Sequence, residues 1–317
     1  MVISDMDNTK MKHKILINEK ISDEAIKYFL SNGIEVKKGF GFTDEQIIEE
    51  LKDCDAFLVR TIEISNNVID NCPNLKVIAK HGTGLDGVDV EYANSKGIEV
   101  INAPGLNANS VAEHTMALIL ACAKHLKETT YEYSKGNYSI KDSVVISEIS
   151  NKTLGLIGYG NIAQRVAKMA RFGFDMNIIV YDPYINKSGI SNYVNVVDDV
   201  DELLSFSDFV SIHIPAKNEN EKFINKDKFG KMKKGAFLIN TSRGNIVDEN
   251  ELINAVENGI IAGACLDVCL NEKANKDSKL FSLSNIILTP HTGGSSKEAL
   301  DNVGLNLANQ IVNILNK

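Results

Sequence analysis

The stretch from Thr153 to Ala163 constrains the fold of this chain more than any other. Its apolar first half predicts a buried strand that ends in the pattern Gly158-x-Gly160-x-x-Ala163, and apolar residues then recur at helical spacing. In a dinucleotide site the first glycine allows a tight turn, the second lets the backbone approach a pyrophosphate, and the small third residue lets the helix pack close to the strand. The N-terminus of the helix offers unpaired N–H groups to the anion. The stretch therefore predicts a dinucleotide-binding site.

A carboxylate stands where such a site needs one. A second apolar strand, residues 177–181, delivers Asp182 about 20 residues beyond the glycines. There the carboxylate would accept hydrogen bonds from the adenine ribose hydroxyls and would repel a 2′-phosphate. We therefore expect NAD, and not NADP, as the cofactor.

Short apolar strands alternate with helical patterns along the whole chain, which predicts an α/β fold with parallel sheets. In the first part we expect helices near residues 23–31 and 44–52, and strands at 15–17, 34–36, 56–59, 77–79 and 98–100. From about Asn151 we expect a doubly wound sheet with strands at 153–157, 177–181, 208–212, 236–240, 262–266 and 286–288. The 317 residues exceed one typical hydrophobic core, so two domains are expected.

The segments outside the two sheets predict how the domains are connected. The turn sequence Asn102-Ala103-Pro104-Gly105 suits a hinge. Beyond it, a long helix from Ser110 to about Thr130 is apolar around most of its circumference, so we expect it to pack on its own domain and on a second copy of the chain in a homodimer. The final amphipathic helix, Ser295–Leu315, is expected to return to the first domain.

The return of the final helix to the first domain predicts a substrate-binding domain of residues 13–107 and 292–317. This domain is interrupted by an NAD-binding domain of residues 108–291, with a cleft expected between the two. Residues 1–12 are polar and lack periodicity, which predicts a tail, with Met11 as a candidate for the original start.

The composition is that of a soluble globular protein, with 44% hydrophobic and 24% charged residues. No apolar run reaches the roughly 20 residues that span a bilayer, and the N-terminus lacks the apolar core of a signal peptide, so the cytoplasm is the expected location. The net charge of −8 gives no general reason to attract nucleic acid or a membrane surface, and an anionic substrate would need local cations. The five cysteines, mostly within apolar segments, predict reduced, packed thiols and neither a disulfide framework nor a metal site.

Polar residues follow the strands of the second domain, where ligands of open α/β sheets bind. They are His213 and Pro215 after the third strand, Thr241, Ser242 and Arg243 after the fourth, Asp267 and Glu272 after the fifth, and His291, Gly293 and Gly294 after the sixth. A guanidinium can bind a carboxylate bidentately, an imidazole can exchange a proton near neutral pH, and a carboxylate can stabilise the imidazolium. We therefore expect Arg243, Glu272 and His291 to converge beside the nicotinamide. Singly, each has a simpler interpretation, as a surface ion pair, a solvated carboxylate and a structural histidine; their joint placement favours catalysis.

A series of ordered motifs extends this interpretation. They are Val59-Arg60-Thr61, His81-Gly82-Thr83-Gly84-Leu85-Asp86-Gly87-Val88-Asp89, Asn102-Ala103-Pro104-Gly105-Leu106-Asn107, Ser110-Val111-Ala112-Glu113-His114, the Gly158 loop, Asn240-Thr241-Ser242-Arg243-Gly244, Leu266-Asp267-Val268 and Thr289-Pro290-His291-Thr292-Gly293-Gly294. From about Leu58 to Ser296 the chain resembles the D-2-hydroxyacid dehydrogenase family. The resemblance implies two Rossmann-like domains, with the NAD domain inserted into a discontinuous substrate domain, and usually a dimer.

The resemblance also implies roles for single residues. Arg243 would anchor the substrate carboxylate, His291 would be the acid/base, and Glu272 would be its carboxylate partner. The other matches are Asp182 for the ribose, Asn161 and Ile162 under the pyrophosphate, Thr241, Arg243, Asp267, His291 and Gly293 along the nicotinamide, and Gly82, Thr83, Gly84 and Asn107 in loops that hold the substrate. The family often has Phe-Glu after Asp267-Val268 and Pro after the catalytic Glu. Here Cys269-Leu270 and Lys273 stand there instead, which leaves the local loop conformation open.

Two cations of the first domain suggest the substrate. Arg60 and Lys80 stand at strand ends expected to face the cleft, and in an acidic chain they suit a second anionic group such as a phosphate. Both resemble basic residues of 3-phosphoglycerate dehydrogenases, so we expect oxidation of 3-phosphoglycerate, the first step of serine biosynthesis. After the last helix no segment remains for a serine-sensing domain, which predicts a short, unregulated form.

Three alternatives stay open. Lys80 could be solvated and Arg60 only structural. The chain could be a glyoxylate or hydroxypyruvate reductase with the same catalytic residues. It could also be a non-catalytic, NAD-sensing module, since corepressors exist that resemble this family.

Overall fold

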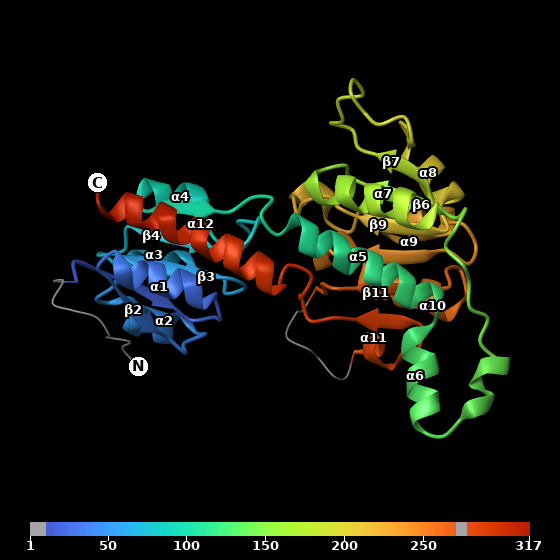
Figure 1. The fold of residues 1–317 in the computed structure, drawn as a ribbon, viewed down its shortest axis with the longest axis horizontal. Helices are drawn as coiled ribbons and strands as arrows, with labels where there is room; N and C mark the ends of the chain where they lie inside the picture. The colour runs from blue at the N-terminus through green and yellow to red at the C-terminus, as the bar shows by residue number, and fades with distance from the viewer. Residues whose placement is uncertain (1–10, 271–277) are drawn as a thin grey trace. The chain divides into compact units, whose positions relative to one another are not determined.

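The strands of the chain form two parallel sheets, each in a compact unit of its own (Figure 1). The structure is a computed structural model that describes residues 11–270 and 278–317. Unit 1 contains the described residues up to Asn107 together with Gly294–Lys317, and unit 2 is Ala108–Gly293. The predicted α/β fold with parallel sheets is confirmed.

Unit 1 holds a five-stranded sheet in the order β2-β1-β3-β4-β5. Its strands are β1 (His13–Ile17), β2 (Ile34–Lys38), β3 (Ala56–Val59), β4 (Val77–Lys80) and β5 (Glu99–Asn102), and its helices are α1 (Asp23–Ser31), α2 (Asp44–Leu51), α3 (Asn66–Asn71), α4 (Val90–Ser95) and α12 (Lys297–Leu315). Helix α12 returns to this unit, as expected: Phe29 of α1 shares a buried cluster with Leu307 and Ile311. A second cluster, with side chains from α2, α3 and α4, covers the other face.

Unit 2 holds a seven-stranded sheet in the order β12-β11-β10-β9-β6-β7-β8. The strands are β6 (Thr153–Ile157), β7 (Asn177–Tyr181), β8 (Val194–Val196), β9 (Phe209–Ile212), β10 (Phe237–Asn240), β11 (Gly263–Leu266) and β12 (Ile286–Leu288). The helices are α5 (Ala108–Ala123), α6 (Leu126–Ser134), α7 (Asn161–Phe174), α8 (Val200–Phe206), α9 (Lys226–Lys231), α10 (Glu249–Glu257) and α11 (Lys279–Ser282). Six of these strands were predicted. Strand β8 was not, because its sequence Val-Asn-Val is short and has a polar residue at its centre, whereas the equally short β12 is wholly apolar.

The strand order of unit 2 reverses beside β6. This strand pairs with β7 on one side and β9 on the other, and Ile157 aligns with both Tyr181 and Ile212. In open α/β sheets such a reversal opens a crevice at the carboxyl ends of the strands, where ligands bind. The segment after β6 contains Gly158, so the chain order places the glycine loop at this point.

The expected long helix from Ser110 to Thr130 is wrong in its second half. Helix α5 ends at Ala123, His125 adopts a left-handed backbone with φ of 49°, and α6 begins at Leu126. None of the described residues of α6 is buried, whereas α5 is buried along most of its length. The apolar surface that supports α5 therefore ends where the helix ends.

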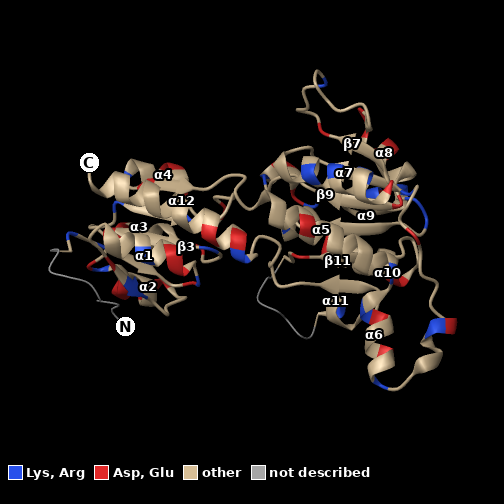
Figure 2. Cartoon of the chain, in the orientation of Figure 1, with Lys and Arg blue, Asp and Glu red and all other residues tan. Residues whose placement is uncertain are grey.

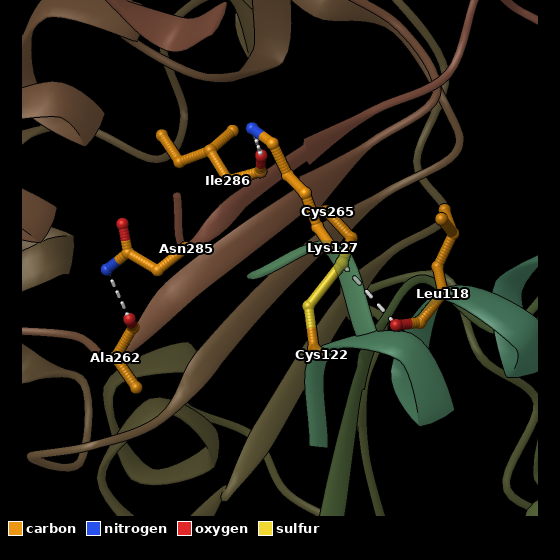
Figure 3. Close-up of a disulfide and its surroundings, with 7 residues drawn as sticks. All are labelled: Leu118, Cys122, Lys127, Ala262, Cys265, Asn285 and Ile286. Atoms are coloured by element: carbon orange, nitrogen blue, oxygen red, sulfur yellow. Dashed lines mark hydrogen bonds between the residues drawn. A yellow bond between two sulfur atoms is a disulfide. The ribbon is translucent and has the colours of Figure 1, made fainter. Parts of the chain in front are cut away.

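The expectation of reduced thiols is also wrong for one pair of cysteines. Cys122 of α5 and Cys265 of β11 form a disulfide (Figure 3), whereas Cys54 and Cys72 are free thiols. The two residues are 143 positions apart in sequence, and the packing of α5 on β11 brings their Cα atoms to 6.9 Å. Removal of a native disulfide typically costs about 2–5 kcal/mol, because a crosslink restricts the unfolded chain. This one ties α5 to the sheet.

A helix that crosses a membrane needs about 20 mostly apolar residues. Within residues 11–270 and 278–317, no helix combines the length and the apolar character that crossing a membrane requires.

Candidate active site

The loop between β6 and α7 has the geometry of a dinucleotide cradle. Gly158 has φ of 91°, and a Cβ built there would lie 2.9 Å from the carbonyl oxygen of His213, so the turn requires glycine. Gly160 is the N-cap of α7, and apart from its chain neighbours no described residue has a heavy atom within 4 Å of the Cβ position. Asn161 and Ile162 form the first turn of α7, whose N-terminus favours an anion. These residues fit a pyrophosphate.

Asp182 lies at the carboxyl end of β7 and is fixed by two backbone groups. Its Oδ2 accepts from the N–H of Tyr159 (2.9 Å), and its Oδ1 accepts from the N–H of Tyr184 (2.9 Å). The first bond ties the carboxylate directly to the glycine loop. A carboxylate can accept several further hydrogen bonds, so Asp182 fits the predicted ribose-binding role.

Serine hydroxyl groups form hydrogen bonds within the segment after β9 and between that segment and the one after β10. His213 Nε2 lies 2.9 Å from Ser211 Oγ, and burial lowers the pKa of His213 to about 4, so its imidazole is neutral near pH 7. The hydroxyl of Ser242 donates to the carbonyl of Ile214, and Pro215 is exposed. The ends of β9 and β10 are thereby tied together.

The loop that carries Arg243 is held by a buried amide. Asn240 Nδ2 donates to the carbonyl of Arg243 (2.8 Å), and Asn240 Oδ1 accepts from the N–H of Ser242 (3.0 Å). A Cβ at Gly244 would overlap the carbonyl group of Cys269, so the loop packs closely on the segment after β11. The Arg243 guanidinium, half-buried, donates through Nη1 to the carbonyl of Ser242 (2.8 Å). Its backbone position is therefore fixed independently of its side chain.

Asp267 organises the loop that carries His291. The carboxylate is 2% exposed and accepts from Thr289 Oγ1 (2.6 Å), the N–H of Thr292 (2.9 Å) and the N–H of Gly293 (2.8 Å). The N–H of His291 donates to the backbone carbonyl of Asp267 (2.8 Å), and His291 has a left-handed φ of 51°. A Cβ at position 293 would lie 2.9 Å from Asp267 Oδ2, which favours glycine there. The loop has one defined conformation because a buried anion binds its backbone.

The structure describes two of the three predicted catalytic residues. Arg243 and His291 both follow strands of one sheet, β10 and β12, at its carboxyl edge. Glu272 lies outside the described residues, so its role stays a prediction.

The predicted substrate residues lie in unit 1, on loops after β3, β4 and β5. Thr83 Oγ1 donates to Asn107 Oδ1 (3.1 Å), and a Cβ at Gly294 would lie 2.9 Å from Asn107 Nδ2. Gly82 has φ of 152°, a backbone conformation that suits glycine, and Gly84 lies in the same loop. The structure therefore brings Thr83, Asn107 and Gly294 together.

The two predicted cations differ in their surroundings. Arg60 Nη2 donates to Ser295 Oγ (2.8 Å) and Nη1 to the carbonyl of Lys20 (3.3 Å), and the guanidinium is part-buried. Lys80 is 5% exposed, and its Nζ donates to the carbonyl of Ile62 (3.1 Å). The alternative of a solvated Lys80 is thereby excluded.

Helix α5 contributes residues to which the sequence analysis assigned no role. Ser110 Oγ donates to the carbonyl of Gly293 (2.6 Å), His114 Nε2 lies 3.2 Å from Asp267 Oδ1, and Thr115 Oγ1 lies 3.0 Å from Thr241 Oγ1. Thr115 is fully buried on this helix. The available signal was the spacing i, i+4 and i+5 of these three polar residues in a largely apolar helix.

Charge is mixed throughout the molecule. Figure 2 shows acidic and basic residues in both units, although single elements differ: the charged residues of α7 are all basic and those of α10 are all acidic. An anionic ligand would therefore depend on single cations such as Arg60 and Arg243, as the sequence suggested.

Comparison with known proteins agrees with this geometry. The family model described as the NAD binding domain of D-isomer specific 2-hydroxyacid dehydrogenase matches residues 116–293. A D-3-phosphoglycerate dehydrogenase of Methanocaldococcus jannaschii is 40% identical over 95% of this chain, which spans only 57% of that relative's length. A hydroxypyruvate reductase of Thermotoga maritima is 38% identical over 95% of this chain and 97% of its own.

A solved structure adds to these findings. The D-lactate dehydrogenase of Aquifex aeolicus, in complex with NAD and lactic acid, superposes with a TM-score of 0.84 at 28% identity, covering 96% of this chain and 95% of its own. The family match and this neighbour confirm NAD as the expected cofactor. The chain belongs to the D-isomer specific 2-hydroxyacid dehydrogenase family.

Proposed function

We propose that the chain is an NAD-dependent dehydrogenase that interconverts a D-2-hydroxy acid and its 2-oxo acid, with 3-phosphoglycerate and 3-phosphohydroxypyruvate as the preferred pair. The arrangement of unit 2 carries the proposal: one carboxyl edge holds the glycine loop with Asp182, the Arg243 loop and the His291 loop. Fold alone would not specify a reaction, but this set of groups suits hydride transfer to and from an alcohol.

Each residue then has a defined task. Bound NAD would supply the acceptor for the hydride that leaves the carbon bearing the hydroxyl group. Arg243 binds the substrate carboxylate, His291 accepts the hydroxyl proton, and Glu272 stabilises the charged imidazole. In the reverse direction His291 returns the proton.

Arg60 supports the phosphorylated substrate. A guanidinium has five N–H donors, so Arg60 can bind a phosphate while it keeps its bonds to Ser295 and Lys20. Replacing Lys80 would be a weaker test of phosphate binding, because removing a buried ammonium would also disturb the packing of unit 1. If the proposal is right, the enzyme catalyses the first step of serine biosynthesis.

The test is substrate preference in the wild type and in Arg60→Ala. We expect the wild type to reduce 3-phosphohydroxypyruvate in preference to hydroxypyruvate, glyoxylate and pyruvate at equal concentrations, monitored by loss of NADH absorbance. A hydrogen bond to a charged group contributes about 1.5–3 kcal/mol, so Arg60→Ala should raise KM for the phosphorylated acid roughly 10- to 150-fold and leave hydroxypyruvate turnover unchanged.

The second candidate is a hydroxypyruvate reductase, favoured by the relative from Thermotoga maritima, which this chain covers almost completely. Preference for hydroxypyruvate, with no effect of Arg60→Ala on any substrate, would select it. Absence of turnover with all four acids would instead favour the NAD-sensing module.

We also propose a homodimer through unit 2. Helices α5 and α7 line a groove of about 910 Å³ whose walls include Met116, Leu120 and Met169, and Phe172 at its edge is 68% exposed. A second copy of this chain would cover this apolar surface. The native mass in solution should be twice that of the chain, and Phe172→Glu should shift it toward the monomer. A cytoplasmic location stays a prediction; the disulfide is unusual for that compartment.

A further inference from the structure

The first turns of α5 hold the loop that follows β12. Ser110 Oγ donates to the carbonyl of Gly293 (2.6 Å), and His114 Nε2 lies 3.1 Å from Thr289 Oγ1 and 3.2 Å from Asp267 Oδ1. Ser110 and His114 are four positions apart and therefore share one face of the helix. Helix α5 thus contacts both ends of the loop Thr289–Gly293, which carries His291 between them.

The hydrogen-bond pattern assigns the proton on His114. The Thr289 hydroxyl donates to Asp267 Oδ1 (2.6 Å), so its own proton is already used. An ionised carboxylate can only accept. His114 Nε2 must therefore carry a hydrogen and donate it toward Thr289 Oγ1 and Asp267 Oδ1. Because the Asp267 carboxylate is 2% exposed, it depends on such donors in place of water.

These donors decide the charge of Asp267. Burial alone would raise the pKa of Asp267, but the hydrogen bonds from His114 and Thr289 and from the backbone N–H groups of Thr292 and Gly293 lower it below the ordinary value. Among the described residues, His114 is the titratable side chain that contacts this carboxylate. His291, the other titratable group of the loop, contacts Asp267 through its backbone N–H.

The sign of a pH effect follows. A carboxylate with a lowered pKa remains ionised until the pH falls to that lowered value. Loss of the His114 donor would raise the pKa of Asp267 again, so its protonation would begin at a higher pH. The backbone groups of Thr292 and Gly293 would then lose their charged acceptor.

We propose that His114 is a positioning residue of the active site: its Nε2–H holds the Asp267 carboxylate and, through it, the loop that presents His291. The benefit to catalysis rests on the proposed function. The coupling between His114 and Asp267 lies wholly within unit 2 and can be tested without turnover.

The first test compares His114→Leu with His114→Gln. Leucine removes the donor, and we expect kcat/KM roughly tenfold lower, the usual effect of losing one hydrogen bond to a charged group, with the acidic limb of its pH profile moved to higher pH. Glutamine retains a side-chain N–H and should restore most of both losses. Glu113→Gln, at the neighbouring exposed position of α5, should leave the profile unchanged. A role in stability alone would lower the melting temperature and the rate but would leave the limb where it is.

The second test follows the amide resonance of Gly293 by NMR during a pH titration. This N–H donates to Asp267 Oδ2, so its shift reports the ionisation of that carboxylate directly. A midpoint that rises in His114→Leu supports the coupling, and it does so even if the wild type oxidises no D-2-hydroxy acid, a result that would overturn only the proposed function. An unchanged midpoint, together with an unmoved acidic limb, would overturn the role of His114.

Discussion

Replacing His291 with Asn is expected to lower kcat for the preferred 2-oxo acid by about 10²- to 10⁴-fold, the usual contribution of a positioned acid/base. The imidazole would exchange the proton of the substrate hydroxyl, and an amide cannot do so at any accessible pH. Asparagine is chosen because His291 has φ of 51°, a backbone conformation that Asn adopts more readily than most residues. The loop should therefore persist, since it is fixed by the backbone N–H of residue 291 and by Asp267.

A matched control separates chemistry from backbone strain. His125 is also left-handed, with φ of 49°, and lies at the junction of α5 and α6, outside the residues assigned to the site. His125→Asn should retain wild-type kcat, and both variants should bind NADH with nearly wild-type affinity in a fluorescence titration. An His291→Asn enzyme with undiminished single-turnover rate would refute the acid/base assignment.

The glycine loop shows what a sequence can predict well. The strand, the turn and the helix start are consecutive in the chain, and each glycine answers a local requirement, as the close approach of His213 to Gly158 illustrates. The same holds for Asp182, whose distance from the loop is set by one strand-helix-strand unit. These features depend on residues that are close together in the sequence, so they can be predicted without a structure.

The features that escaped prediction depend on contacts between distant segments. Cys122 and Cys265 become partners only when α5 packs on β11. The buried ammonium of Lys80 donates to the carbonyl of Ile62, a contact that no periodic pattern reveals. His114 belongs to a recognised motif, yet its contact with Asp267 spans two elements far apart in the chain. The sequence therefore identifies the residues and motifs, whereas the contacts between distant segments become known only from the tertiary structure.

Replacing Arg243 with Gln should damage substrate binding and rate together. Loss of one partner of a hydrogen-bonded charge pair costs about 2–5 kcal/mol, which corresponds to a drop in kcat/KM of roughly 30- to 5,000-fold. We expect KM for the oxo acid to rise, because the carboxylate loses its bidentate partner, and kcat to fall, because the carbon that accepts hydride is no longer held in place. Initial rates over a range of oxo-acid concentrations would measure both.

The variant should remain folded, since the loop is held by Asn240 through the backbone of residues 242 and 243. Arg171→Gln, near the far end of α7, removes the same charge away from the carboxyl edge of the sheet and should leave both constants unchanged. Added guanidinium should partly restore the rate of Arg243→Gln if the missing group is the carboxylate anchor, because the ion can occupy the vacated position. A variant with wild-type KM and no response to guanidinium would show that Arg243 only shapes the loop, and the substrate carboxylate would then have to be bound by another cation.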